Sequence, residues 1–252
     1  MRSTFYRVRS GLPENIRIAL VADLHAGKPW DAIEVLKKCS PDYILLAGDI
    51  LEGLDGTKDE INKDAFFIFE ECVRIAPTFY STGNHEDGGV NSGTRKWNTS
   101  LEKDRVYTEE NIKRIEATGV TMLVNSYVMR DGIAFGGLAS GIICKDAIPD
   151  IDFLQEFAKA DAPKILISHH PEYYDKYIKE LDVDLTVSGH AHGGQWRFFG
   201  RGVYSPGQGL FPKYTSGVYD NRLVVTKGLK KGFIPRIFNP REIVIIETER
   251  ML

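Results

Sequence analysis

Five apolar stretches along the chain have the length and pattern of buried β-strands. Residues 15–22 alternate between polar and apolar positions and then become continuously apolar, which predicts a strand that enters a buried sheet. Similar strands are predicted over 43–47, 78–82, 164–168 and 185–188, and a last strand over 241–247 is expected to close the sheet. Amphipathic patterns between these stretches predict helices over 32–39, 63–75, 109–118, 150–159 and 173–181.

Each of the five apolar strands runs into side chains that can bind a metal ion. Taken singly, each of these residues has a plain structural explanation, such as a turn aspartate or a solvated loop histidine. Their joint occurrence is more informative, because ligand sites in α/β folds gather at the carboxyl ends of strands. The residues are Asp23 and His25, Asp49, Asn84 and His85, His169, and His190 and His192.

Composition narrows the class of protein. The 252 residues contain no linker-like or low-complexity segment, which favours a single domain over residues 1–252. The net charge of −3 and the dispersed Lys and Arg residues argue against a nucleic-acid partner. No apolar run could span a bilayer, and the basic first nine residues lack the apolar centre of a signal peptide, so a cytoplasmic protein is expected. The three cysteines are scattered and show no Cys-x-x-Cys spacing, so any metal ion is expected to be held by His and carboxylate side chains.

The order of these motifs resembles that of the calcineurin-like metallophosphoesterase superfamily. The elements D-x-H, G-D, G-N-H-E, H and G-H-x-H occur in that order within residues 16–194. The tail resembles the bacterial branch of YkuE- and YaeI-type phosphodiesterases. That likeness rests on residues 189–195, 205–214, 227–229 and 236–243.

The resemblance implies an α/β fold, a four-layer α-β-β-α sandwich of two mixed sheets flanked by helices, with two divalent metal ions at its loop edge. By resemblance, the first ion is held by Asp23, His25, Asp49 and His192, and the second by Asp49, Asn84, His169 and His190. His170 directly follows His169, and we assign the ligand to His169 from its position at the strand end. The mixed nitrogen and oxygen donors suit Mn, Fe or Zn.

The same resemblance implies a metal-dependent phosphoester hydrolase, a phosphodiesterase or pyrophosphatase, with a metal-bridging hydroxide as nucleophile. His85 is expected to act on the leaving oxygen, and Glu86, where many relatives have Asp, to orient His85. The expected substrate is a small phosphodiester or a lipid-like pyrophosphate. Two alternatives remain: a non-catalytic metal-binding interaction module on the same fold, or a nuclease.

Large apolar residues recur in the tail among Gly, Pro and basic residues. They either pack a C-terminal sheet edge or form an apolar wall beside the metals, suited to a lipid-like or aryl leaving group. The second explanation leaves contact with a membrane surface open. The residues are Trp196, Phe198, Phe199, Leu210, Phe211, Phe233, Ile234 and Phe238.

Overall fold

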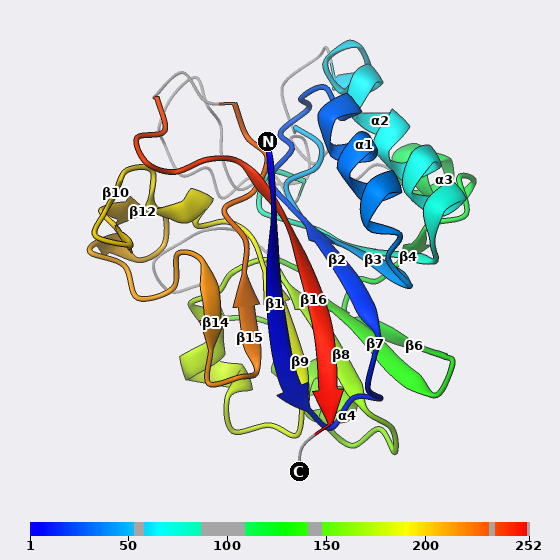
Figure 1. Cartoon of the computed structure of the whole chain (residues 1–252). Helices are drawn as coiled ribbons and strands as arrows, with labels where there is room; N and C mark the ends of the chain where they lie inside the picture. The colour runs from blue at the N-terminus through cyan, green and yellow to red at the C-terminus, as the bar shows by residue number, and fades with distance from the viewer. Residues whose placement is uncertain (53–57, 87–108, 141–147, 232–234, 251–252) are drawn as a thin grey trace.

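Two six-stranded sheets form the centre of the computed structural model, which describes residues 1–52, 58–86, 109–140, 148–231 and 235–250 (Figure 1). The first sheet has the order β1 (Arg2–Ser10), β16 (Glu242–Arg250), β2 (Arg17–Val21), β3 (Tyr43–Ala47), β4 (Thr78–Ser81) and β5 (Thr121–Met122). The second has the order β14 (Gly217–Tyr219), β15 (Leu223–Val225), β9 (Leu185–Ser188), β8 (Lys164–Ser168), β7 (Ile133–Leu138) and β6 (Ser126–Arg130).

Helices cover the outer faces of both sheets. The first sheet packs against α1 (Trp30–Cys39), α2 (Lys58–Ile75) and α3 (Glu109–Glu116) through an apolar cluster that includes Leu36, Phe69 and Ile115. The second packs against α4 (Ile151–Ala158) and the π-helix η1 (Tyr174–Ile178). Between the sheets the rings of Phe79 and Phe135 stack with centroids 4.0 Å apart. The predicted four-layer sandwich is therefore confirmed.

The five predicted strands are the central ones of the two sheets. Strands β2, β3 and β4 pair in parallel in the first sheet, and β8 and β9 pair in parallel in the second. Their carboxyl ends therefore meet at one edge of the sandwich, with all the expected ligand loops on that edge. No helix of the described residues has the length and apolar character needed to cross a membrane.

The predicted last strand is present as β16 (Glu242–Arg250), but it does not close the first sheet. Strand β16 lies between β1 and β2, and β1 forms the edge of the sheet (Figure 1). Residues 2–10 show little apolar pattern because one face of this edge strand is exposed to solvent, so no strand was predicted there.

Two short hairpins and a turn extend from the second sheet. The 3-10 turn η2 (His192–Gly194) leads into β10 (Arg197–Phe198) and β11 (Arg201–Gly202), which pair antiparallel. Strands β12 (Tyr204–Ser205) and β13 (Gly209–Leu210) form the second hairpin. The hairpins thus continue directly from the loop that carries His190 and His192.

Candidate metal centre

All six histidines of the chain lie in one cluster at this edge. The rings of His25 and His192 have centroids 5.1 Å apart, and those of His169 and His190 are also 5.1 Å apart. His85 meets His25 edge-on at 4.4 Å, and His170 lies 4.3 Å from His190. Loops that are distant in sequence, after β2, β4, β8 and β9, therefore bring every imidazole of the protein to one place.

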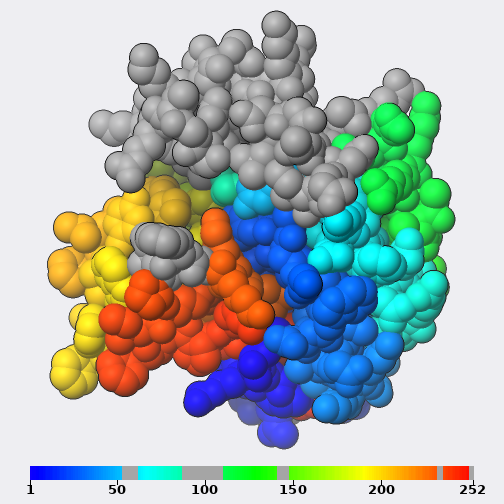
Figure 2. All heavy atoms as spheres, turned by 90° about the horizontal axis from the view of Figure 1, so that it is seen from above, coloured from blue at the N-terminus to red at the C-terminus, as the bar shows by residue number. Residues whose placement is uncertain are grey.

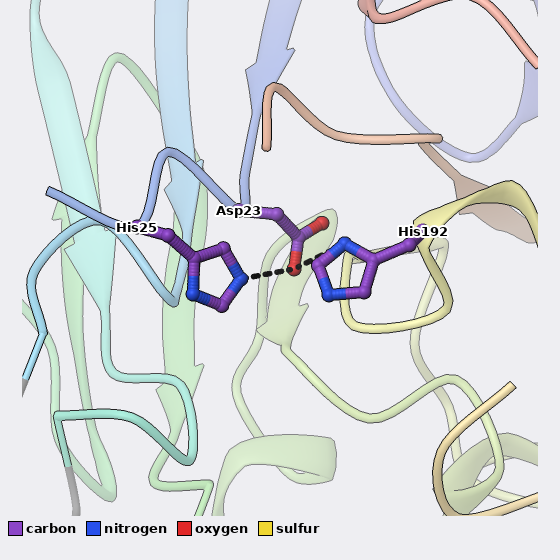
Figure 3. A group of neighbouring side chains, drawn as sticks. All are labelled: Asp23, His25 and His192. Carbon is purple, nitrogen blue, oxygen red and sulfur yellow. Dashed lines mark ion pairs between the residues drawn. The ribbon is translucent and has the colours of Figure 1, made fainter. Parts of the chain in front are cut away.

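One half of the cluster consists of Asp23, His25 and His192 (Figure 3). Asp23 Oδ1 lies 4.0 Å from His25 Nε2 and 3.8 Å from His192 Nδ1. Burial lowers the pKa of His25 to about 4 and that of His192 well below its ordinary value, in each case assisted by neighbouring positive groups. Both imidazoles are therefore neutral at pH 7, which is the form that binds metal ions.

The other half consists of Asp49, His169 and His190. Asp49 Oδ2 lies 3.2 Å from His169 Nε2 and 3.6 Å from His25 Nε2, so it faces ligands of both halves. Burial would raise the pKa of Asp49, but His169 and the other nearby imidazoles outweigh it and hold the pKa well below its ordinary value. An ionised aspartate between the two halves has the placement that a bridging ligand needs.

Several of these side chains carry buried polar atoms that have no hydrogen-bond partner in the described part of the chain. An unpartnered polar atom in a protein interior costs free energy, so a group of such atoms is typical of a ligand site. Nitrogen and oxygen donors of this kind suit a divalent transition metal. Six of the seven expected ligands contribute such an atom: Asp23 Oδ2, His25 Nε2, Asn84 Oδ1, His169 Nε2, His190 Nε2 and His192 Nδ1.

The backbone at the expected ligands is strained. Five of the seven adopt a positive φ, between 47° and 65°, although none of them is a glycine. Such conformations are disfavoured for residues with a Cβ and persist where the surrounding structure fixes them. Bonds between the loops supply that constraint here. His190 N donates to Asp23 Oδ1 at 3.0 Å, and His25 N donates to the Asp49 carbonyl at 2.9 Å.

Two glycines let backbone approach the aspartates closely. A Cβ on Gly83 would lie 2.2 Å from Asp49 Oδ1, and a Cβ on Gly228 would lie 2.3 Å from Asp23 Oδ2. Neither distance is possible for a real side chain without displacement of the carboxylate. Gly228 also has φ +68°, so both space and conformation require glycine there.

Glu52, which no sequence motif singled out, binds two imidazoles at once. Its Oε1 lies 2.6 Å from His25 Nδ1 and its Oε2 lies 2.7 Å from His85 Nδ1. Burial would raise the pKa of Glu52, but its bonds to His25 and His85 outweigh it and lower the pKa. An ionised carboxylate on both Nδ1 atoms keeps a proton on each of them and directs each Nε2 into the pocket. The sequence feature that could have identified Glu52 is its position shortly after Asp49, in the same loop.

The expected role of Glu86 as the group that orients His85 was wrong. The Glu86 carboxylate turns into the loop after β3, where it is fully buried and accepts hydrogen bonds from four backbone amides. Among the described residues, Glu52 is the carboxylate that hydrogen-bonds the His85 ring. Glu86 therefore fixes the shape of the ligand loop. The four donors are the amides of Asp49, Ile50, Leu51 and Gly83, at 2.8, 2.6, 2.9 and 2.7 Å.

His170 uses both ring nitrogens within the protein. Its Nε2 lies 2.6 Å from Ser140 Oγ and its Nδ1 lies 3.3 Å from Glu172 Oε1. By contrast, His169 bonds the Ala47 carbonyl through Nδ1, and its Nε2 has no hydrogen bond to the described residues, as in a metal ligand. This geometry favours His169 as the ligand. Glu172, also missed from the sequence, adds a carboxylate 3.8 Å from His190 Nε2.

Several proteins with similar sequences are named as metallophosphoesterases or phosphodiesterases. A metallophosphoesterase of Campylobacter jejuni, Cj0846, is 28% identical over 254 residues, which cover 94% of this chain and 60% of that protein. Phosphodiesterase YaeI of Escherichia coli K12 is 27% identical over 196 residues, 72% of this chain and 62% of YaeI. The chain spans about half to three fifths of the length of these two proteins and of metallophosphoesterases from Caenorhabditis elegans and Helicobacter pylori that it also matches.

A solved structure, TT1561 of Thermus thermophilus, is similar over 69% of this chain and 81% of that chain, with 14% identity and a TM-score of 0.47. The chain also matches a protein family. Residues 16–194, from the strand before Asp23 to the glycines after His192, match the calcineurin-like phosphoesterases. The chain therefore belongs to the calcineurin-like phosphoesterase family.

Proposed function

We propose that this chain hydrolyses a phosphoester with the help of two divalent metal ions, and that the substrate is a diester or a pyrophosphate. One observation carries the proposal. Imidazole nitrogens that have no hydrogen-bond partner among the described residues come from loops of both sheets and face two buried aspartates. His25 Nε2 and His169 Nε2 lie 3.6 and 3.2 Å from Asp49 Oδ2, and His192 Nδ1 lies 3.8 Å from Asp23 Oδ1. Two divalent ions held there would neutralise a phosphate group and activate water for in-line attack.

The chain's own residues divide into two ligand sets under this proposal. Asp23, His25 and His192 would hold one ion, and Asn84, His169 and His190 the other, with Asp49 shared. Asn84 contributes a neutral oxygen, which limits the negative charge that an anionic substrate meets. The donor set suits Mn, Fe or Zn.

His85 is placed to act on the leaving group. It is the most exposed of the imidazoles named above, with a side chain 15% accessible, and its Nε2 lies 3.8 Å from Asp49 Oδ2. Glu52 holds the opposite ring nitrogen, so Nε2 is directed toward the space that a substrate would enter. As water attacks phosphorus and the ester P–O bond breaks, the leaving oxygen would take its proton from His85.

The test separates catalysis from metal binding. His85→Asn should lower kcat for bis-p-nitrophenyl phosphate strongly while metal content by mass spectrometry stays near that of the wild type. His192→Ala should lower the metal content itself. Equal loss of metal in both variants would remove the role given to His85. An absence of turnover by the Mn-loaded wild type would favour the non-catalytic module, and salt-sensitive DNA binding would favour a nuclease.

A further inference from the structure

The two hairpins after η2 present large apolar side chains to solvent. Packing against a sheet edge was one explanation for the apolar residues of the tail, but five of these side chains are 50 to 106% exposed. Phe233 and Ile234 lie outside the described residues. Single exposed apolar residues are ordinary on protein surfaces, whereas a contiguous group marks an interaction site. The group, called here the aromatic face, consists of Phe198, Phe199, Leu210, Phe211 and Phe238.

Contacts join the chain segments that carry the aromatic face. The rings of Phe198 and Phe238 have centroids 6.2 Å apart. The amide of Arg197 donates to the Ile237 carbonyl, and the amide of Phe211 donates to the Val203 carbonyl between the hairpins. Figure 2 shows these yellow to red segments together on one side of the molecule.

The aromatic face is fixed to the metal centre through η2. Arg197 Nη1 donates to the Gly193 carbonyl at 2.9 Å, and Asn239 Nδ2 donates to the His192 carbonyl at 2.7 Å. The Cα of Gly202 in β11 would lie 2.4 Å from a Cβ on Gly194, so hairpin and turn are in direct backbone contact. Whatever binds the aromatic face is therefore held near the candidate metal centre.

The charge of this part of the chain is opposite to that of the rest. Residues 193–241 contain nine Lys and Arg residues and one acid, Asp220, although the whole chain carries a net charge of −3. Three of these cations, Lys213, Lys227 and Arg241, pair with acids from other parts of the chain. Asp220 belongs to the turn between β14 and β15 and pairs with Lys179 at 2.8 Å. Arg201, in the β10–β11 hairpin, and Lys231 are exposed. Cations next to exposed aromatic rings are complementary to a lipid interface with anionic headgroups.

From these observations, and from the pairing of Arg201 with Phe198 across the β10–β11 hairpin, we infer that the aromatic face docks on an anionic lipid bilayer, with the phenylalanines inserted at the headgroup boundary and Arg201 near the lipid phosphates. Apolar burial supplies most of the binding, and the cations add a salt-dependent attraction. This inference does not require the proposed hydrolysis, because a surface can bind lipid whatever the metal centre does.

The test is flotation of the whole chain with vesicles of phosphatidylcholine, with or without phosphatidylglycerol. Wild type should float with the mixed vesicles, and added salt should weaken its binding. A variant with Phe199→Ser, Phe211→Ser and Phe238→Ser should bind at least about tenfold more weakly. The matched control replaces exposed apolar residues on three other elements, Phe5→Ser, Phe67→Ser and Met129→Ser, which are 57, 43 and 54% exposed.

The outcomes distinguish this inference from others. Both triple variants should keep the wild-type circular dichroism spectrum and its turnover of a soluble diester without vesicles. Equal vesicle binding by the aromatic-face variant and the control would overturn the inference, as would a wild type that does not float. If the wild type dimerises in sedimentation equilibrium and does not bind vesicles, while the aromatic-face variant is monomeric, the face binds a second copy of the chain instead.

Discussion

Glu52 offers the sharpest test of how the candidate metal centre is organised. Its carboxylate contacts His25 Nδ1 at 2.6 Å and His85 Nδ1 at 2.7 Å, one oxygen to each ring. In Glu52→Gln, a single oxygen remains and an NH₂ group takes the place of the other. The amide can then accept a hydrogen bond from one imidazole, while its NH₂ faces the second.

The effect of this substitution depends on which ring nitrogen of each histidine then carries the proton. If the NH₂ group faces His25, the ring must accept on Nδ1 and carry its proton on Nε2, the atom that faces Asp49 at 3.6 Å. A protonated Nε2 cannot bind a metal ion. If the NH₂ group faces His85, that ring loses the carboxylate that directs it. A hydrogen bond to a charged group contributes about 1.5–3 kcal/mol, so we expect kcat/KM to fall about 10- to 100-fold.

The assay is turnover of bis-p-nitrophenyl phosphate together with metal content by mass spectrometry. Glu34→Gln is the matched control, because Glu34 is an exposed glutamate on α1 and is not among the residues of the cluster. We expect the control to match wild type in both measurements. Wild-type kcat/KM and metal content in Glu52→Gln would show that the two short contacts do not position the rings, and would refute the role given to Glu52.

Three further predictions follow from the buried contacts. Glu86→Gln should lower the free energy of unfolding, measured in urea, by about 2–4 kcal/mol, because the new NH₂ group would face backbone amide donors. The control Glu116→Gln, on the surface of α3, should change the free energy of unfolding little. Gly228→Ala should reduce metal content by displacing Asp23, whereas Gly132→Ala, also at positive φ but with no atom within 4 Å of its Cβ, should not. Removal of metal by a chelator should lower Tm. Addition of Mn at about 100-fold over its Kd should then raise the free energy of unfolding by about 2.7 kcal/mol, which corresponds to a rise in Tm of about 5–10 °C by scanning fluorimetry. An unchanged Tm would contradict the idea that the unpartnered atoms are metal ligands.

The strands and their polar ends could be predicted because both depend on short-range pattern. A buried central strand such as 43–47 is continuously apolar on both faces, and Asp49 stands out directly after it. Parallel pairing of central strands then places their ends together without further information. Strand β1 could not be predicted in this way, because its exposed edge position leaves no clear apolar pattern.

Side-chain direction within the loops could not be predicted from the sequence. Glu86 follows His85 directly, and proximity suggested a contact, but the turn after Asn84 sends its carboxylate toward the amides of the β3 loop. Glu52 comes from a different loop and reaches both rings across the pocket. Which of two nearby carboxylates orients an imidazole depends on loop conformations that no spacing encodes.

The two aspartates show why the candidate metal site and the fold cannot be separated here. Asp23 Oδ1 accepts the backbone N–H of His190, which joins a loop of the first sheet to a loop of the second. Asp49 Oδ1 accepts the N–H of His85 at 2.9 Å, which joins the loops after β3 and β4. Each carboxylate therefore holds neighbouring ligand loops in their strained backbone conformations while it faces the imidazoles. Since the same group fixes the loops and presents charge to the pocket, a change that removes either carboxylate should loosen the ligand geometry as well as remove a ligand.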